Sequence, residues 1–292
     1  MEDTEAGVLP SLNVSFKTTS GITREVVEQH GLRVEVAGAD TEAQPSVADL
    51  THAVHMPFNE APLGRLNYAA TEPDFRNRSL ERIKECLQAA GSGFPNAQIA
   101  VIHGSPSRWI THEHPGARSG NYELFIEGLR ELADCAADNG LLLVLENNNC
   151  YWYNNSLEYT WVDSEPHSEL RYFATTSAHW IRAWEDAAHA NLKLCLDTAH
   201  ACTYAHTFDD HTERTEALLG YFDHPEAIGH VHWNGHLAFE PKGRVDEHLT
   251  VGDGTIPVEV HRRIKQLDVR PTLEHYHGEG ALKRELDFIR EL

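Results

Sequence analysis

The chain has 292 residues, of which 41% are apolar, so it can bury a core as large as that of a barrel of roughly 250 residues. It carries 45 acidic and 24 basic residues, and the resulting net charge of −21 opposes nucleic-acid binding at low salt. There is no apolar run of about 18 residues, which excludes a transmembrane helix. The acidic first ten residues do not resemble a secretory or transit peptide.

The acidic residues are spread along the whole chain, and lysine is scarce. This pattern is typical of proteins from high-salt cytoplasms, where surface charge maintains solubility. The alternative is an acidic surface that selects a cationic partner. It would need a clustered acidic tract, and the sequence has none. The five cysteines are scattered and form no CxxC pair. This favours a role as small buried hydrophobic residues over a metal or redox motif. We therefore expect a cytoplasmic protein.

Apolar runs of strand length recur through the chain and alternate with amphipathic stretches. We predict eight strands, at Leu12–Lys17, Leu32–Ala37, His52–Phe58, Gln98–His103, Leu141–Glu146, Leu192–Asp197, Ile228–Trp233 and Pro271–His275. Between them, residues such as Phe125, Leu129 and Leu132 follow helical spacing, and Ala281–Leu292 is the last predicted helix. Eight alternating units predict an α/β fold, a closed (β/α)₈ barrel, in a single domain spanning 1–292.

Two loops stand out. Asn147–Pro166 is rich in Asn, Tyr and Trp, and a loop of that length is either a lid over a site or a surface insertion. Gly235–Gly254 follows the seventh predicted strand and carries Asp246 and His248.

Ligand-type side chains stand at the ends of six predicted strands: His55, His103, Glu146, Asp197, His232 and Glu274. Catalytic groups of a (β/α)₈ barrel come from these ends. Ionised carboxylates after apolar runs are costly unless they are paired or bind a metal. Carboxylates and imidazoles that converge suit Zn²⁺ or Mn²⁺.

A structural explanation exists for each of these residues. With 20 histidines in the chain, a single one is more often a surface or core residue than a ligand, and the carboxylates could form paired structural contacts. We expect the flanking histidines not to be ligands, because neighbouring strand residues point to opposite faces. These are His230, His236, His275 and His277.

Several ordered segments resemble the xylose-isomerase-like TIM barrel superfamily, over about residues 50–280. They are His55-Met-Pro-Phe-Asn59, Val101-Ile-His-Gly-Ser105, Leu145-Glu-Asn147, Cys195-Leu-Asp-Thr-Ala-His-Ala201, His230-Val-His-Trp-Asn234, Asp246-Glu-His248 with Val251-Gly-Asp-Gly254, and Thr272-Leu-Glu274. The superfamily includes sugar phosphate isomerases, ketose epimerases and endonuclease IV. The resemblance implies a metal core at Glu146, Asp197, His232 and Glu274.

In the ketose epimerase branch, the two glutamates also form the acid/base pair, and His200 resembles a substrate-contacting histidine. Endonuclease IV instead has a trinuclear zinc set, and its pattern matches these four residues with His55, His103, His200, Asp246 and His248. These five are therefore expected to contact either further metal or substrate.

Three departures count against the nuclease. Its Asn-Thr-Ala-Gly-Gln stretch is missing after Glu146, its His-Val-Ser opening is missing near Leu12–Ser20, and no basic loop is visible. We therefore expect a metal-dependent sugar or sugar phosphate isomerase or epimerase that acts through an enediolate on a small ketose-like substrate. The expected metal is Mn²⁺ or Zn²⁺, with Mg²⁺ or Co²⁺ also possible. The alternatives are an endonuclease IV-like phosphodiesterase acting on abasic DNA, and a barrel that binds metal or sugar without catalysis. A membrane or nucleic-acid partner is not expected, and a homo-oligomer is left open.

Overall fold

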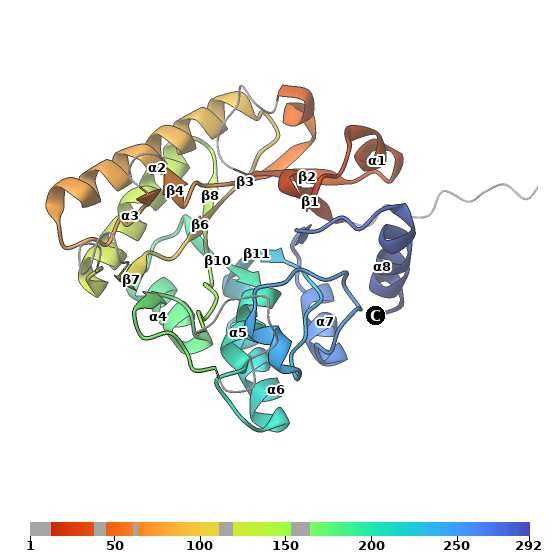
Figure 1. Ribbon diagram of the computed structural model, residues 1–292. Coiled ribbons are helices and arrows are strands. Elements are labelled where there is room, and N and C mark those ends of the chain that lie inside the picture. Colours follow the sequence, from red (N-terminus) through yellow and green to blue (C-terminus); the bar gives the residue numbers. More distant parts are fainter. Residues whose placement is uncertain (1–12, 38–44, 61–63, 111–118, 153–163) are drawn as a thin grey trace, which may run out of the picture.

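The computed structural model describes residues 13–37, 45–60, 64–110, 119–152 and 164–292. Among these residues, eight parallel strands close into one barrel in the order β1-β2-β3-β6-β8-β10-β11-β12, with β12 pairing back to β1 (Figure 1). The barrel strands are β1 (Ser15–Lys17), β2 (Arg33–Ala37), β3 (Thr51–His55), β6 (Ile99–His103), β8 (Leu142–Glu146), β10 (Leu192–Asp197), β11 (Ile228–His232) and β12 (Thr272–Leu273).

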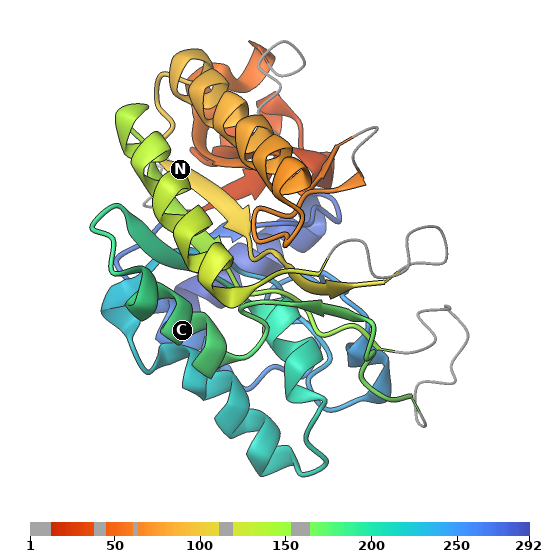
Figure 2. The same cartoon turned by 90° about the vertical axis from the view of Figure 1, so that its left-hand side faces the viewer.

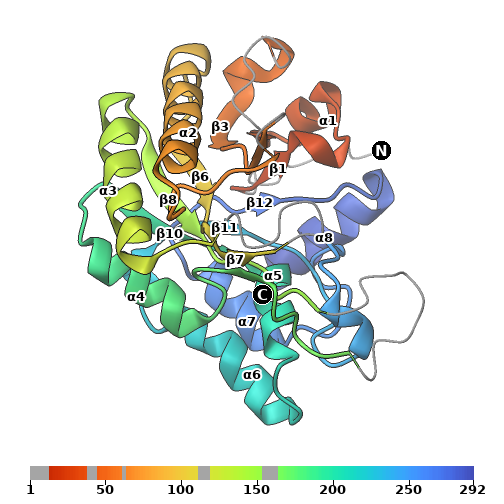
Figure 3. The ribbon, with the colours of Figure 1, turned by 60° about the vertical axis from the view of Figure 1, so that its left-hand side comes forward.

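Helices surround this barrel on the outside (Figure 3). They are α1 (Arg24–Gln29), α2 (Pro73–Gly93), α3 (Tyr122–Asp138), α4 (Ser177–Ala187), α5 (Thr198–Ala205), α6 (His211–Leu219), α7 (Val258–Lys265) and α8 (Glu279–Glu291). Within the described part of the chain, no helix has both the length and the apolar composition to cross a membrane.

The longest helices show how local sequence sets the architecture. Helix α3 begins after Asn121, whose side chain accepts a hydrogen bond from the Leu124 backbone N–H at 3.0 Å. Its apolar stripe, which includes Phe125 and Leu129, is fully buried. Helix α2 runs beside α3, and together they cover one side of the barrel (Figure 2).

The predicted (β/α)₈ barrel is confirmed, with shorter strands at some ends. Strand β3 ends at His55 and not at Phe58, since Pro57 has no N–H to continue the ladder. Strand β12 keeps only two of the five predicted residues. The last helix begins two residues earlier than Ala281 and ends one residue before Leu292. Leu12 lies outside the described residues, as does most of the Asn147–Pro166 loop.

The barrel interior has an apolar side and a polar side. Ala53, Ile99, Val101, Val144 and Cys195 form a small buried cluster from β3, β6, β8 and β10. The facing strands β1, β2, β11 and β12 fill the interior with hydrogen-bonded polar side chains, all buried or half-buried: Ser15, Lys17, Glu35, His230 and Thr272. The polar side lies beneath the functional residues described next.

Two short antiparallel sheets extend the chain beyond the barrel (Figure 2). Strands β4 (Asn59–Glu60) and β5 (Gly64–Arg65) form one, and β7 (Pro106–Trp109) and β9 (Leu170–Tyr172) form the other. Both follow the carboxyl ends of barrel strands, which is the end where barrel enzymes place their active sites.

Candidate metal centre

Three carboxylate side chains approach the imidazole of His232 at the carboxyl ends of the barrel strands. His232 ends β11, and its Nδ1 lies 3.1 Å from Glu146 Oε1, 3.5 Å from Glu274 Oε1 and 3.7 Å from Asp197 Oδ2. Glu146 ends β8, Asp197 ends β10, and Glu274 directly follows β12. All four residues are at most 8% exposed. The structure thus brings together the four residues that the sequence analysis assigned to a metal core.

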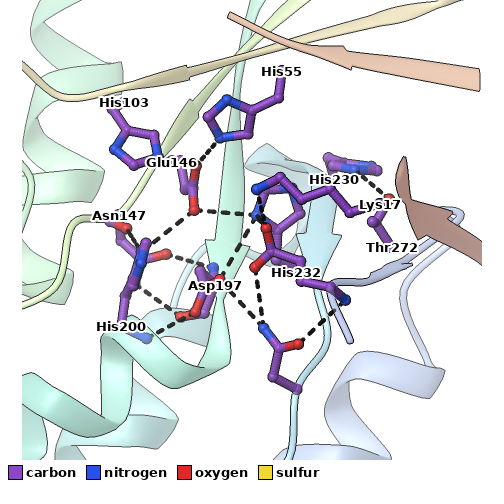
Figure 4. Close-up of polar contacts among 12 residues, drawn as sticks. Lys17, His55, His103, Glu146, Asn147, Asp197, His200, His230, His232 and Thr272 are labelled. Carbon is purple, nitrogen blue, oxygen red and sulfur yellow. Dashed lines mark hydrogen bonds and ion pairs between the residues drawn. The ribbon is translucent and has the colours of Figure 1, made fainter. Parts of the chain in front are cut away.

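Glu146 also connects this core to two further histidines (Figure 4). Its Oε2 lies 3.0 Å from His55 Nε2 and 3.0 Å from His103 Nε2. The two imidazoles come from the ends of the neighbouring strands β3 and β6. The position of His103 follows from the parallel register, in which it pairs with Glu146, and His55 pairs with Val101 of the same strand as His103.

A third group lies on the other side of the core. Asp197 caps helix α5, and its Oδ1 accepts a hydrogen bond from the His200 backbone N–H at 2.7 Å. His200 Nε2 lies 3.2 Å from Asp246 Oδ2, and His248 Nε2 lies 3.3 Å from Asp246 Oδ1. His248 Nδ1 is 3.7 Å from Glu274 Oε2. All nine sequence-predicted residues therefore line one continuous cluster.

The hydrogen bonds of three imidazoles favour metal ligation. His55 and His200 donate from Nδ1 to backbone carbonyls, at 2.9 and 2.8 Å. His232 donates from Nε2 to the Glu35 carboxylate at 3.0 Å. When these rings are neutral, as metal binding requires, the remaining nitrogen of each ring holds its lone pair and faces carboxylate oxygens. Ligating histidines in proteins are usually held by such an outer hydrogen bond.

The pKa values of the buried carboxylates also favour a metal site. Burial raises the pKa of Asp197 to about 7 from 3.8, and the neighbouring Glu274 adds to the rise. Burial also opposes ionisation of Glu146, but His103 and His232 outweigh it and hold the pKa of Glu146 well below its usual range. A divalent cation would supply the positive charge that these buried carboxylates need. The residues present fit a metal, and carboxylate with imidazole suits Zn²⁺ or Mn²⁺.

Three groups can each offer ligand atoms within 4.8 Å of one another around these residues: His55, His103 and Glu146; Glu146, Asp197 and His232; and Asp197, His200 and His248. A fourth such group, Glu35 with His230 and His232, lies deeper in the barrel. Glu146, Asp197 and His232 are each shared between two of these groups.

Three residues of the site escaped the sequence analysis. Lys17, at the end of β1, forms an ion pair with Glu274 Oε1. Glu35 in β2 binds His232 from below. Asn234 donates from Nδ2 to Asp197 Oδ2 at 3.4 Å and to Glu274 Oε2 at 3.2 Å. Glu35 could have been found from the sequence, because it is a charged residue between the apolar residues of the strand Arg-Val-Glu-Val-Ala.

His230 was expected not to be a ligand because its side chain would point to the opposite face, and this reason was wrong, whereas the non-ligand role itself stays a prediction. His230 and His232 are two residues apart in β11, so their side chains share a face, and His230 Nε2 lies 2.8 Å from Glu35 Oε2 inside the barrel. His236, His275 and His277 belong to none of the four ligand groups. His275 is nevertheless connected to the site, since its Nδ1 lies 3.1 Å from Asn234 Oδ1.

The aromatic residues of the Asn147–Pro166 loop, which was expected to be either a lid or a surface insertion, are only partly described. Tyr151 packs against Trp109 with ring centroids 5.8 Å apart. Trp152 is 2% exposed and donates from Nε1 to the Thr203 carbonyl at 3.1 Å. Tyr153 lies outside the described residues. Tyr151 therefore contacts strand β7 of the small outer sheet, and Trp152 contacts helix α5.

Comparison with known proteins supports this architecture. The D-psicose 3-epimerase of Agrobacterium fabrum is 25% identical over 178 residues, which are 58% of this chain and 55% of that protein, so the chain spans about half the length of this relative. A D-tagatose 3-epimerase-like protein has a TM-score of 0.65 at 19% identity, covering 95% of this chain and 98% of that one. A Thermus thermophilus protein soaked with ZnCl₂ has a TM-score of 0.64 at 20% identity, covering 97% and 99%.

A family model described as "Xylose isomerase-like TIM barrel" matches residues 24–292. The match includes seven of the eight barrel strands and every residue of the nine-residue cluster. It confirms the resemblance found in the sequence motifs. The chain belongs to the xylose isomerase-like TIM barrel family.

Proposed function

We propose that the chain is a metal-dependent sugar isomerase or epimerase that acts on a small ketose-like substrate. The observation that carries the proposal is the approach of two glutamates, Glu146 and Glu274, to one imidazole nitrogen from different strands. The match to a D-psicose 3-epimerase supports the substrate class. The experiment that tests it is incorporation of solvent deuterium into a ketose by metal-loaded protein.

Glu146, Asp197, His232 and Glu274 would hold the ion, with Mn²⁺ or Zn²⁺ best suited and Mg²⁺ or Co²⁺ also compatible. When bound, a divalent ion polarises a carbonyl and lowers the pKa of the adjacent C–H. Asn234 orients two of the carboxylates through its amide N–H groups.

The two glutamates move the proton. One carboxylate removes the proton from the carbon beside the carbonyl, leaving an enediolate, and a carboxyl group then returns a proton to complete the isomerisation or epimerisation. Burial opposes ionisation of Glu274, but His232 and Lys17 outweigh it and hold the pKa of Glu274 well below its usual range. Glu274 is thus ionised at neutral pH, as a general base must be.

A second candidate is an endonuclease IV-like phosphodiesterase. The gathering of His55, His103, His200, Asp246 and His248 around the core favours it, because a trinuclear site needs these additional ligands. The net charge of −21 argues against it, since DNA binding depends on cationic contacts to phosphates.

Further proposals concern the domain organisation, the cellular location, the oligomeric state and the surface charge of the protein. Residues 1–292 would form one domain, and the protein would act in the cytoplasm, as a monomer or a homo-oligomer. Its acidic surface would be adapted to a salt-rich medium.

His200→Ala is expected to lower activity far more than it lowers the melting temperature. The ring lies 3.3 Å from Glu146 and 3.2 Å from Asp246, so its loss removes a ligand or a substrate contact. The matched control is His206→Ala, since His206 is also buried and donates from Nε2 to the Leu237 carbonyl at the far end of α5. Turnover and thermal unfolding would be measured for both. Equal losses of activity in the two variants would assign His200 to packing.

A further inference from the structure

Glu35 is a carboxylate in the middle of the barrel strand β2, with 0% exposure. Its strand neighbours Val34 and Val36 face the outer core, so Glu35 faces the barrel interior. It lies directly beneath the candidate metal centre, on the polar side of the interior. A charged side chain in this place is costly unless strong hydrogen bonds compensate for its desolvation.

Three donors provide that compensation. His232 Nε2 lies 3.0 Å from Glu35 Oε1 and 3.2 Å from Oε2, and His230 Nε2 lies 2.8 Å from Oε2. The Thr272 hydroxyl donates to Oε2 at 3.0 Å. All three partners direct a donor group at the two oxygens, so Glu35 acts as an acceptor in each of these contacts.

An acceptor-only partner determines where His232 carries its proton. The proton must be on Nε2, so in the neutral ring the lone pair is on Nδ1. Nδ1 is the atom that lies within 3.7 Å of Glu146, Asp197 and Glu274. A bare lone pair that faces three carboxylates is unfavourable, so either a metal ion or a second proton on Nδ1 has to lie between them.

Space filling alone does not account for Glu35. Alanine, valine, isoleucine and cysteine fill the opposite side of the same interior. The carboxylate is instead bonded to the one ring that the three core carboxylates share. The apolar side shows that this barrel can be filled without a buried charge.

We propose that Glu35 is a positioning residue that fixes the ring orientation and the Nε2–H form of His232, and thereby strengthens metal binding at Nδ1. This inference rests on the metal site of the proposed function. It predicts effects on metal affinity and on the His232 proton that a purely structural role would not produce.

The test compares Glu35→Gln with wild type by chelator-competition titration of Zn²⁺. Glutamine replaces one of the two acceptor oxygens by an NH2 group and removes the negative charge, so a donor faces an imidazole N–H and the hold on His232 is weakened. We expect Zn²⁺ affinity to fall by about 10- to 100-fold. The matched control is His261→Phe, which removes the bond from Trp233 Nε1 to His261 Nδ1 (2.9 Å) outside the barrel. The control should lose stability and keep its Zn²⁺ affinity.

A second measurement needs no variant. Long-range ¹H–¹⁵N spectra of metal-free wild type should show a slowly exchanging proton on His232 Nε2, and a bare Nε2 would overturn the proposal. Zn²⁺ affinity within twofold of wild type in Glu35→Gln would also overturn it. If wild type binds no metal while the Nε2 proton is present, the proposed function fails and the Glu35–His232 contact stands.

Discussion

Glu146→Gln and Glu274→Gln are each expected to lower the rate of ketose epimerisation by about 100- to 10,000-fold, the usual contribution of a positioned acid or base. Glutamine keeps the size of the side chain but cannot take up a proton from carbon. Both residues are buried at the strand ends, so the loss cannot be replaced by solvent. Turnover of a ketose at saturating metal is the measurement.

Because both residues are also candidate ligands, the metal content of each variant has to be measured beside its activity. Glu240→Gln is the matched control, since Glu240 accepts from the Thr255 hydroxyl at 2.7 Å on an exposed loop outside the cluster. A variant that retains bound metal and loses turnover identifies a proton-transfer role. Full turnover in either variant would remove that glutamate from the mechanism.

Metal removal is expected to abolish activity and to lower the melting temperature. A bound ion at 1,000 times its dissociation constant stabilises the folded state by about 4 kcal/mol. Without it, the negative charges of the buried carboxylates Glu146, Asp197 and Glu274 are balanced, among the described residues, by imidazoles and Lys17. Dialysis against a chelator, then titration with Mn²⁺ or Zn²⁺ during thermal unfolding, measures the effect.

Metal affinity should rise with pH, because binding requires deprotonated carboxylates and imidazoles. Burial raises the pKa of Asp197 to about 7 in the metal-free protein, so protons compete for this carboxylate and the affinity should fall further as pH drops below this value. The metal-to-chain ratio from elemental analysis adds a second criterion. One ion per chain favours the isomerase, and three favour the phosphodiesterase. A chelated protein with unchanged activity and melting temperature would exclude a metal role.

The barrel could be predicted from the sequence because its strands are buried on both faces. Runs such as Leu141–Leu145 read as strands without any long-range information. The metal core followed from the same regularity, since parallel strands place their carboxyl ends on one rim. Asp197 and His232 are side by side in register between β10 and β11, as that argument requires.

The interior polar layer could not be predicted in this way. Only ligand-type residues at strand ends were considered, and Glu35 lies in the middle of a strand while Lys17 is not a ligand type. The face of His230 could have been predicted correctly. His230 and His232 are two positions apart in one strand, so their side chains lie on the same face. The contacts of Glu35 with β11 and β12 depend on barrel closure, which joins segments about 200 residues apart.

Deuterium exchange tests the central claim most directly. Metal-loaded wild type would be incubated with ketoses, including D-psicose, in D₂O in a salt-rich buffer, which suits a chain of net charge −21. The same preparation would be given DNA with an abasic site. We predict deuterium at the carbon beside the carbonyl, absent in Glu274→Gln, and nicking no faster than background. Metal-dependent nicking that is lost in Glu274→Gln, without deuterium incorporation, would contradict the account.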